Sequence, residues 1–172
     1  GADRYKLELM LHQVGLHHFF EGRIFSGHEM PRGKPHPDVY LAAAAHLQVD
    51  PAHCLVVEDT PMNQQLAQWT LQKLGCTVDI AENGEVALQK IRTTTYDLIL
   101  MDLQMPGMDG LTATYEIRRI EIIEALRMTP IVAMTAHVLD EDRILAQKAG
   151  MQDFLIKPVS AAEFQRVLKR FL

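Results

Sequence analysis

The sequence lacks several features that would place it outside the ordinary soluble globular proteins. It has two cysteines among 172 residues, too few for a disulfide framework, which indicates a reduced cytosolic protein. No apolar run is long enough to cross a membrane, and the first residues lack the apolar core of a signal peptide. An excess of basic residues is also missing. The net charge is −5, which argues against a nucleic-acid surface because phosphate contacts need clustered Lys and Arg. We therefore expect a cytoplasmic protein that binds neither membranes nor nucleic acid.

From residue 54 onward, short apolar runs alternate with segments whose apolar residues recur three and four positions apart, the spacing of an amphipathic helix. Glycine and proline separate these segments. The alternation predicts an α/β fold, a doubly wound five-stranded parallel sheet, because parallel neighbours need helical crossovers. The expected strands are 54–59, 77–82, 97–102, 130–135 and 153–158, and the expected helices are 62–74, 84–92, 109–125, 138–148 and 160–171.

Residues 1–53 follow a different pattern and form a separate segment in front of the domain at 54–172. The pattern predicts a helix at about 3–14, a short strand at 23–27 and a second helix at 38–47. Such a segment is too small to bury a core of its own. We therefore expect it to pack against the sheet that follows.

Polar side chains fall at the carboxyl ends of four predicted strands, the edge where doubly wound sheets bind their ligands. They are Asp59, Asp102, Thr135 and Lys157. Because Glu58 precedes Asp59, three carboxylates would meet at this edge, and they repel one another unless a hard dication such as Mg²⁺ lies among them. One carboxylate can then act as a nucleophile toward a phosphoryl group. Lys157 and the Thr135 hydroxyl can stabilise the phosphoryl oxygens.

Residues 54–172 resemble the receiver domain of two-component response regulators. The matching segments are VVED, DLILMDLQMPGMDG, IVAMTAH and FLIKP, in the order and spacing of that family. The resemblance implies a flavodoxin-like fold with strand order 2-1-3-4-5 and a Mg²⁺-dependent phosphoacceptor. Its phosphoryl group would come from a histidine kinase, a phosphotransfer protein or a small acyl phosphate. The AMTAH segment is most similar to receivers attached to hybrid histidine kinases.

The same resemblance assigns roles at the expected metal site. It implies that Asp102 is the phosphoacceptor and that Glu58 and Asp59 hold Mg²⁺ with it. The backbone carbonyl of Gln104 would complete the protein ligands. Thr60 departs from the Asn that is common at this position in the group, and we expect the metal site to tolerate it.

Further roles are implied for residues around the phosphoryl group. Thr135 and Lys157 would contact that group, Phe154 would be the aromatic switch, and the bond from Lys157 to the following proline would be cis. Taken alone, Thr135 would be an ordinary strand residue and Phe154 a core residue. Aspartates such as Asp109 and Asp140 are expected only to cap helices. The functional interpretation therefore depends on the four segments together.

Residues 3–60 resemble a second family, the haloacid dehalogenase-like hydrolases, in their phosphosugar phosphatase branch. The matching segments are RYKLELMLHQVGLHHFFEGRIFSG, GKPHPDVYLAAAAHL and CLVVEDT. This resemblance implies that Lys34 is a vestigial phosphate-binding lysine and that Glu58 and Asp59 bind the metal. That family's nucleophile strand does not precede these segments, and its general acid would fall on Gln104, whose amide cannot protonate an alkoxide. Phosphoester hydrolysis is therefore the alternative function.

Both resemblances include the strand at 54–59, because both families hold Mg²⁺ with acids after a central strand. We interpret the chain as an engineered fusion at that strand. The chain then carries two segments that could form the last strand and helix of the sheet, one within residues 1–53 and one at the carboxy terminus. We expect the carboxy-terminal segment, whose strand ends at Lys157, to occupy that place. The other would add a sixth strand, pack elsewhere or exchange with a second molecule in a homodimer. A folding chimera without catalytic function is a further alternative.

Overall fold

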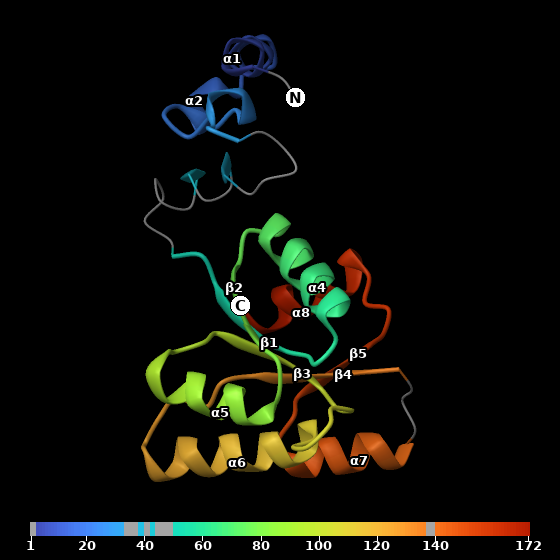
Figure 1. The fold of residues 1–172 in the computed structure, drawn as a ribbon. Coiled ribbons are helices and arrows are strands. Elements are labelled where there is room, and N and C mark those ends of the chain that lie inside the picture. The colour runs from blue at the N-terminus through green and yellow to red at the C-terminus, as the bar shows by residue number, and fades with distance from the viewer. Residues whose placement is uncertain (1–2, 33–37, 40–41, 44–49, 137–139) are drawn as a thin grey trace. The chain divides into compact units, whose positions relative to one another are not determined.

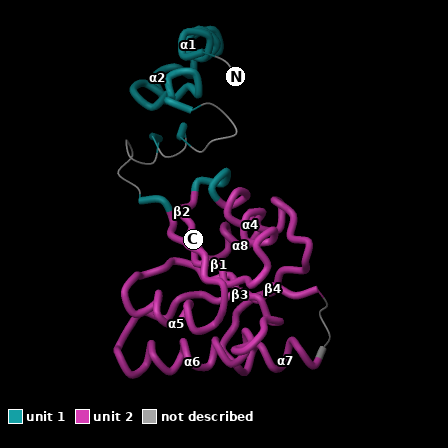
Figure 2. The backbone as a smooth tube through the Cα atoms, viewed as in Figure 1, with its two compact units in different colours: residues 1–51, 72–75 teal, residues 52–71, 76–172 magenta. Residues whose placement is uncertain are grey.

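The computed structural model describes residues 3–32, 38–39, 42–43, 50–136 and 140–172. The chain divides into two compact units, one made of residues 1–51 with 72–75 and the other of residues 52–71 with 76–172 (Figure 2). No helix in these described ranges has the length and apolar character that a membrane span requires.

A parallel five-stranded sheet forms the centre of the larger unit (Figure 1). Its strands are β1 (His53–Val57), β2 (Thr77–Ala81), β3 (Leu98–Asp102), β4 (Ile131–Thr135) and β5 (Asp153–Ile156). Their order is β2-β1-β3-β4-β5, which confirms the predicted fold. Every residue of β3 and β4 is buried, as expected for central parallel strands that are covered on both faces.

Helices cover both faces of this sheet. They are α4 (Pro61–Lys73), α5 (Gly84–Thr93), α6 (Gly110–Ile123), α7 (Asp140–Ala149) and α8 (Ala161–Phe171). Figure 1 shows α4 and α8 on one face and α5, α6 and α7 on the other. The carboxylate of Asp109 accepts a hydrogen bond from the Thr112 amide at 2.7 Å, so it caps α6 as predicted. Asp140 is the first residue of α7, and its side chain lies outside the described part.

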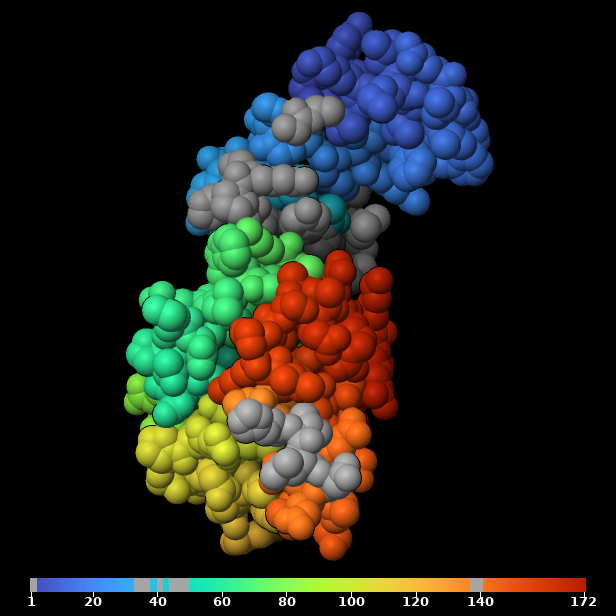
Figure 3. All heavy atoms as spheres, turned by 90° about the vertical axis from the view of Figure 1, so that its right-hand side faces the viewer, coloured from blue at the N-terminus to red at the C-terminus, as the bar shows by residue number. Residues whose placement is uncertain are grey.

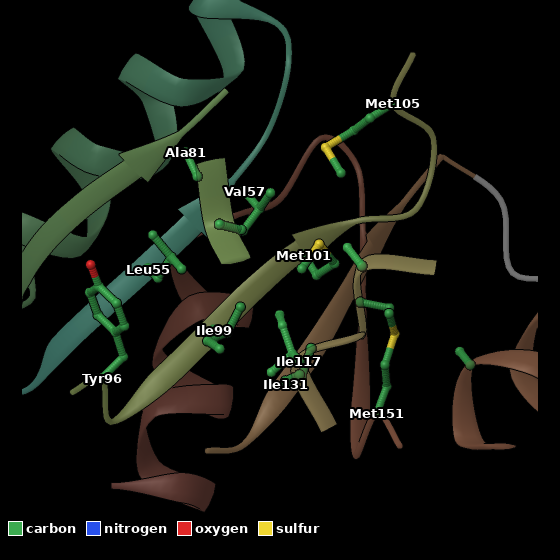
Figure 4. Packing of buried hydrophobic residues seen from close by; sticks show 14 residues of the cluster. Leu55, Val57, Ala81, Tyr96, Ile99, Met101, Met105, Ile117, Ile131 and Met151 are labelled. Atoms are coloured by element: carbon green, nitrogen blue, oxygen red, sulfur yellow. The ribbon is translucent and has the colours of Figure 1, made fainter. Parts of the chain in front are cut away.

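The main core lies between the sheet and the helices α5, α6 and α7 (Figure 4). Leu55 and Val57 of β1 and Ile99 and Met101 of β3 point to this side, because every second residue of a strand faces the same way. Ile117 of α6 packs against them. Each such side chain contributes about 1.5–3 kcal/mol when it is fully buried. This core holds the strands in register and so determines where their carboxyl ends meet.

The smaller unit begins with α1 (Arg4–Gln13) and α2 (His17–Phe20), followed by a 3-10 helix, η1 (Gly27–Glu29). Asp3 caps α1 by accepting a hydrogen bond from the Lys6 amide at 2.8 Å. The Arg4 guanidinium binds Glu29 of η1 through two hydrogen bonds of 2.8 and 3.1 Å. The helix expected at about 3–14 is therefore confirmed.

The short strand expected at 23–27 is wrong. Residues 23–26 form no strand, and Gly27 begins η1. A strand needs a neighbour to complete its N–H and C=O hydrogen bonds, and the described part of residues 1–51 contains no second strand. The sheet accordingly has no sixth strand among the described residues. Most of the helix expected at 38–47 and the predicted phosphate ligand Lys34 lie outside the described residues.

The carboxy-terminal candidate for the last strand is the one found in the sheet. β5 pairs in parallel with β4, with Thr135 opposite Ile156. The bond from Lys157 to Pro158 that follows is cis, as the receiver resemblance implied.

Candidate metal centre

Acidic and basic side chains gather where β1, β3, β4 and β5 end. Figure 3 shows the face of the larger unit at this edge, where α4 in green, the segment after β3 in yellow and the segment after β5 in red come together. The pairing of the strands explains why these side chains meet. Val57 at the end of β1 lies opposite Met101, and Asp102 at the end of β3 lies opposite Met134. The first residues after neighbouring strands are therefore neighbours in space.

Three of the four metal ligands predicted from the sequence offer side-chain oxygens here. Glu58, Asp59 and Asp102 each present an oxygen, and these oxygens lie within 4.8 Å of one another. Glu58 is 1% exposed and Asp102 is 3% exposed, whereas Asp59 is partly open to solvent. Such a set of carboxylates repels itself without a cation, and an all-oxygen set suits Mg²⁺. No other group of three or more His, Cys, Asp or Glu side chains comes this close within the described part of the chain.

Lys157 bridges two of these carboxylates. Its Nζ lies 2.5 Å from Glu58 Oε2 and 2.7 Å from Asp102 Oδ2. Burial lowers the pKa of Lys157, but the hydrogen bonds to Asp102 and Glu58 outweigh burial and raise it above the ordinary lysine value. The side chain therefore stays a cation in the centre of the cluster.

The two bridged acids differ in their protonation energetics. Burial raises the pKa of Glu58, but the hydrogen bonds from Lys157 and Asn63 outweigh it, so that the pKa falls below the ordinary value. At Asp102 burial is the larger influence, and the pKa lies above the ordinary value although Lys157 lowers it. Asp102 is thus the acid whose charge the fold compensates less completely.

Glu58 is held by the first turn of α4 as well as by Lys157. Its Oε1 accepts hydrogen bonds from Asn63 Nδ2 at 3.1 Å and from the Thr60 amide at 3.2 Å. The side chain of Gln64 donates to the Glu58 carbonyl at 2.6 Å. Thr60 Oγ1 donates to Asp59 Oδ1 at 3.4 Å. Asn63 and Gln64 were not predicted as site residues. The sequence did contain a signal for them, namely two amide side chains in the helical turn directly after an acid pair.

Asp102 ends β3, and the chain turns tightly behind it. The amide of Gln104 donates to Asp102 Oδ1 at 3.1 Å. A Cβ added to Gly110, the first residue of α6, would lie 2.1 Å from the Asp102 carbonyl oxygen. Only glycine allows this approach, so the start of α6 is seated directly against the end of β3. The predicted role of the Gln104 carbonyl as a metal ligand stays a prediction.

Thr135 and Phe154 lie on the side of the site toward β5. Thr135, the last residue of β4, is 4% exposed, and its carbonyl accepts the Lys157 amide at 2.8 Å. Phe154 is half-buried and packs against the main core, with the Arg143 guanidinium 5.6 Å from its ring centre. Thr135 therefore ends the strand next to the one that carries Asp102, and Phe154 lies one strand further.

Two family models match this chain. One describes a response regulator receiver domain and matches residues 54–169. The other describes a haloacid dehalogenase-like hydrolase and matches residues 1–69. Their overlap, residues 54–69, contains all of β1 except His53, the acid pair and the first part of α4. This is where the sequence predicted that the two resemblances meet.

Relatives and solved structures agree with the longer match. The chain is 38% identical over 120 residues to the transcription factor SKN7 of Saccharomyces cerevisiae, covering 70% of this chain and 18% of that protein. It is 36% identical over 140 residues to the sensor histidine kinase GacS of Pseudomonas protegens, covering 81% of this chain and 15% of that protein. The chain thus spans less than a fifth of either relative.

Two solved structures reproduce the fold of the larger unit. The receiver domain of sensor histidine kinase PA1611 from Pseudomonas aeruginosa, solved with a magnesium ion coordinated in its active site cleft, is 40% identical with a TM-score of 0.62 and covers 71% of this chain and 98% of that one. The chemotaxis protein CheY4 of Vibrio cholerae is 28% identical with a TM-score of 0.66 and covers 72% of this chain and 100% of that one.

Proposed function

The chain belongs to the response regulator receiver family, and we propose that it works in phosphorelay signalling by accepting a phosphoryl group on Asp102. Glu58, Asp59 and Asp102 would hold Mg²⁺. The observation that carries this proposal is the cluster of their oxygens within 4.8 Å. Lys157 supports the proposal, because its ammonium group is hydrogen-bonded to two of these three carboxylates and so supplies positive charge beside the expected metal ion.

In the transfer, a carboxylate oxygen of Asp102 attacks phosphorus and forms the new P–O bond. The bond from phosphorus to the donor breaks, and the donor leaves with the electron pair as an imidazole or as a carboxylate. When bound, Mg²⁺ offsets the charge shared by the phosphoryl oxygens and the acids. Lys157, now 2.7 Å from Asp102 Oδ2, would donate instead to a phosphoryl oxygen. The Thr135 hydroxyl would donate to another. Water later takes the phosphoryl group and regenerates the carboxylate.

The readout of phosphorylation would run through Thr135 and Phe154. A phosphoryl group draws the Thr135 hydroxyl toward Asp102 and vacates space beside β4. Phe154, which is only half-buried, would turn into that space. The consequence would be an altered surface on α7, whose Arg143 now lies over the Phe154 ring.

A phosphodonor protein would dock on α4. Met62, Leu66 and Trp69 are 78%, 45% and 51% exposed, and their spacing puts them on one side of the helix. Leu66 also lines a cavity of about 50 Å³ together with Glu58 and Lys157. This apolar stripe therefore leads to the site, and it suits a phosphohistidine-bearing partner of the kind that a histidine kinase or phosphotransfer protein presents.

The test is phosphorylation by acetyl phosphate with Mg²⁺, followed by intact-mass measurement. We expect an adduct of one phosphoryl group that is abolished by a metal chelator and by Asp102→Asn. Asp109→Asn is the matched control, since it alters a nearby aspartate that only caps α6, and it should leave the adduct unchanged. Labelling that survives in Asp102→Asn would reject the assignment.

Hydrolysis of phosphomonoesters is the second candidate, supported by the family match over residues 1–69. A p-nitrophenyl phosphate assay on the same variants separates the two. Steady turnover that depends on Asp102 would support the hydrolase. A stable adduct without turnover would support the receiver, and the absence of both would leave a folded chimera without catalysis.

A further inference from the structure

β5 is an edge strand of the sheet, since β4 is its only neighbouring strand among the described residues. An edge strand presents main-chain N–H and C=O groups with which another extended chain can form hydrogen bonds. A cavity of about 520 Å³ is lined by side chains of α7, β5 and α8, among them Arg143, Ile144, Asp153, Phe154 and Arg170. This cavity gives an incoming chain access to β5.

Phe154 and Ile156 are the residues of β5 whose main-chain groups point away from β4. The Lys157 amide donates to the Thr135 carbonyl of β4 at 2.8 Å. Because the main-chain groups of a strand alternate in direction from one residue to the next, Leu155 also faces β4, and the residues between point outward. A further strand would therefore have to bond to Phe154 and Ile156.

Side chains already bond to both outward groups of Phe154. Its N–H donates to Asp153 Oδ1 at 2.8 Å, and its C=O accepts a hydrogen bond from Arg166 Nη2 at 3.0 Å. Arg166 also donates to Asp153 Oδ2 through Nη1 at 2.6 Å. One carboxylate and one guanidinium, bonded to each other, therefore cover the N–H and the C=O of the same residue.

Neighbouring residues of α8 hold these two side chains in place. Glu163 accepts a hydrogen bond from Arg166 Nε at 3.2 Å, and Arg170 donates to Asp153 Oδ2 at 2.9 Å. Burial raises the pKa of Asp153, but the hydrogen bonds from Arg166 and from the Phe154 amide outweigh it and lower the pKa. Partly exposed ion pairs contribute little to stability, so the main consequence of this network is the direction of its bonds.

We propose that Asp153 and Arg166 form an edge cap that prevents β5 from pairing with β5 of a second copy of this chain. Two copies related by a two-fold axis beside Leu155 would place these strands antiparallel, because a two-fold interface joins identical surfaces. The Phe154 carbonyl of each copy would then accept the Ile156 amide of the other. The Arg166 guanidinium lies on that carbonyl, and Asp153 holds the adjacent N–H.

The first experiment compares the self-association of the wild type, Arg166→Met and Asp153→Ala by sedimentation equilibrium over a range of concentrations. Methionine keeps the unbranched stem of Arg166 and removes only the guanidinium. We expect both variants to form dimers with a dissociation constant at least about tenfold lower than that of the wild type, since each copy gains a main-chain hydrogen bond.

Arg170→Met is the matched control, because it removes an arginine that bonds to Asp153 but makes no contact with the main chain of β5. Its self-association should equal that of the wild type. If Arg166→Met associates no more strongly than the wild type, or if Arg170→Met associates as strongly as Arg166→Met, the proposal is wrong. The second result would mean that the loss of charge alone drives association.

The second experiment locates the interface by amide hydrogen exchange in the Arg166→Met dimer and in the same variant diluted to monomer. The outward-pointing Ile156 amide should exchange about tenfold or more slowly in the dimer, whereas the amides of β2, at the other edge of the sheet, should be unchanged. Protection of β2 or of residues 3–32 without protection of Ile156 would overturn the proposal. Association accompanied by a large fall in the urea midpoint would also overturn it, because unfolding would then be the cause.

Discussion

Replacing Lys157 by methionine tests the charge balance of the site most directly. The substitution keeps an unbranched side chain and removes the ammonium that lies 2.5 Å from Glu58 Oε2 and 2.7 Å from Asp102 Oδ2. Those two side chains are 1% and 5% exposed, so water cannot take over the role of the lysine. The variant should therefore be destabilised when no divalent cation is present.

The size of the effect has an upper bound. Removing one partner of a buried pair costs about 3–5 kcal/mol, and Lys157 is 21% exposed, which favours the lower part of that range. The variant can also escape the repulsion by protonating Asp102. At pH 7 this costs about 4 kcal/mol, from an ordinary aspartate pKa of about 3.9 and about 1.36 kcal/mol per pH unit. We therefore expect a loss of about 2–4 kcal/mol in the free energy of unfolding.

The stability of the Lys157→Met variant should depend on pH, because protonation of Asp102 limits the loss. Loss of the lysine raises the folded-state pKa of Asp102 further, so the folded variant binds a proton that the unfolded chain releases. Its stability relative to the wild type should therefore recover as the pH falls, and the cost of protonation is only about 1.5 kcal/mol at pH 5.

The assay is urea unfolding at pH 7 and pH 5, in a chelator and in millimolar Mg²⁺. Mg²⁺ should stabilise Lys157→Met more than the wild type, because the ion replaces the missing charge and binds only the folded cluster. Lys148→Met, on the exposed side of α7, is the control and should change stability by less than about 0.5 kcal/mol. Wild-type stability in the chelator, with no larger response to Mg²⁺, would refute the view that Lys157 holds the acids together.

Three further predictions concern other parts of the larger unit. Gly110→Ala should displace the start of α6, since its Cβ would lie 2.1 Å from a carbonyl oxygen, and lower the unfolding free energy by about 1–3 kcal/mol. Urea unfolding measures this loss, and an unchanged unfolding free energy would contradict the close approach of α6 to the end of β3. Tyr96→Phe removes the 2.7 Å hydrogen bond that is the first cause of the lowered pKa of Asp79. Its deficit of about 1 kcal/mol at pH 7 should shrink in acid unfolding below about pH 4, and a constant deficit would contradict the assignment. Leu66→Ser should slow transfer from a phosphohistidine protein, measured with radiolabelled phosphate, and leave labelling by acetyl phosphate unchanged.

The sequence was informative where the pattern is local. The five strands begin and end within about two residues of their predicted limits, because each apolar run is bounded by glycine, proline or a polar cluster. The strand expected at 23–27 failed for the complementary reason. Residues 23–26 have the composition of a strand, but a strand is stabilised by its neighbours in a sheet, and composition alone cannot supply one.

The order of helices and strands, and with it the placement of Asp59, Asp102, Thr135 and Lys157 near one edge, follows from the sequence alone, since periodicity and turn residues act over a few positions. The pairing within that edge depended on the tertiary structure. Lys157 meets Glu58 across a separation of 99 residues, and no local pattern encodes which of three neighbouring acids a lysine will choose. Strand order, burial and the hydrogen bonds of α4 decided it, because the energies of buried charges depend on every group around them.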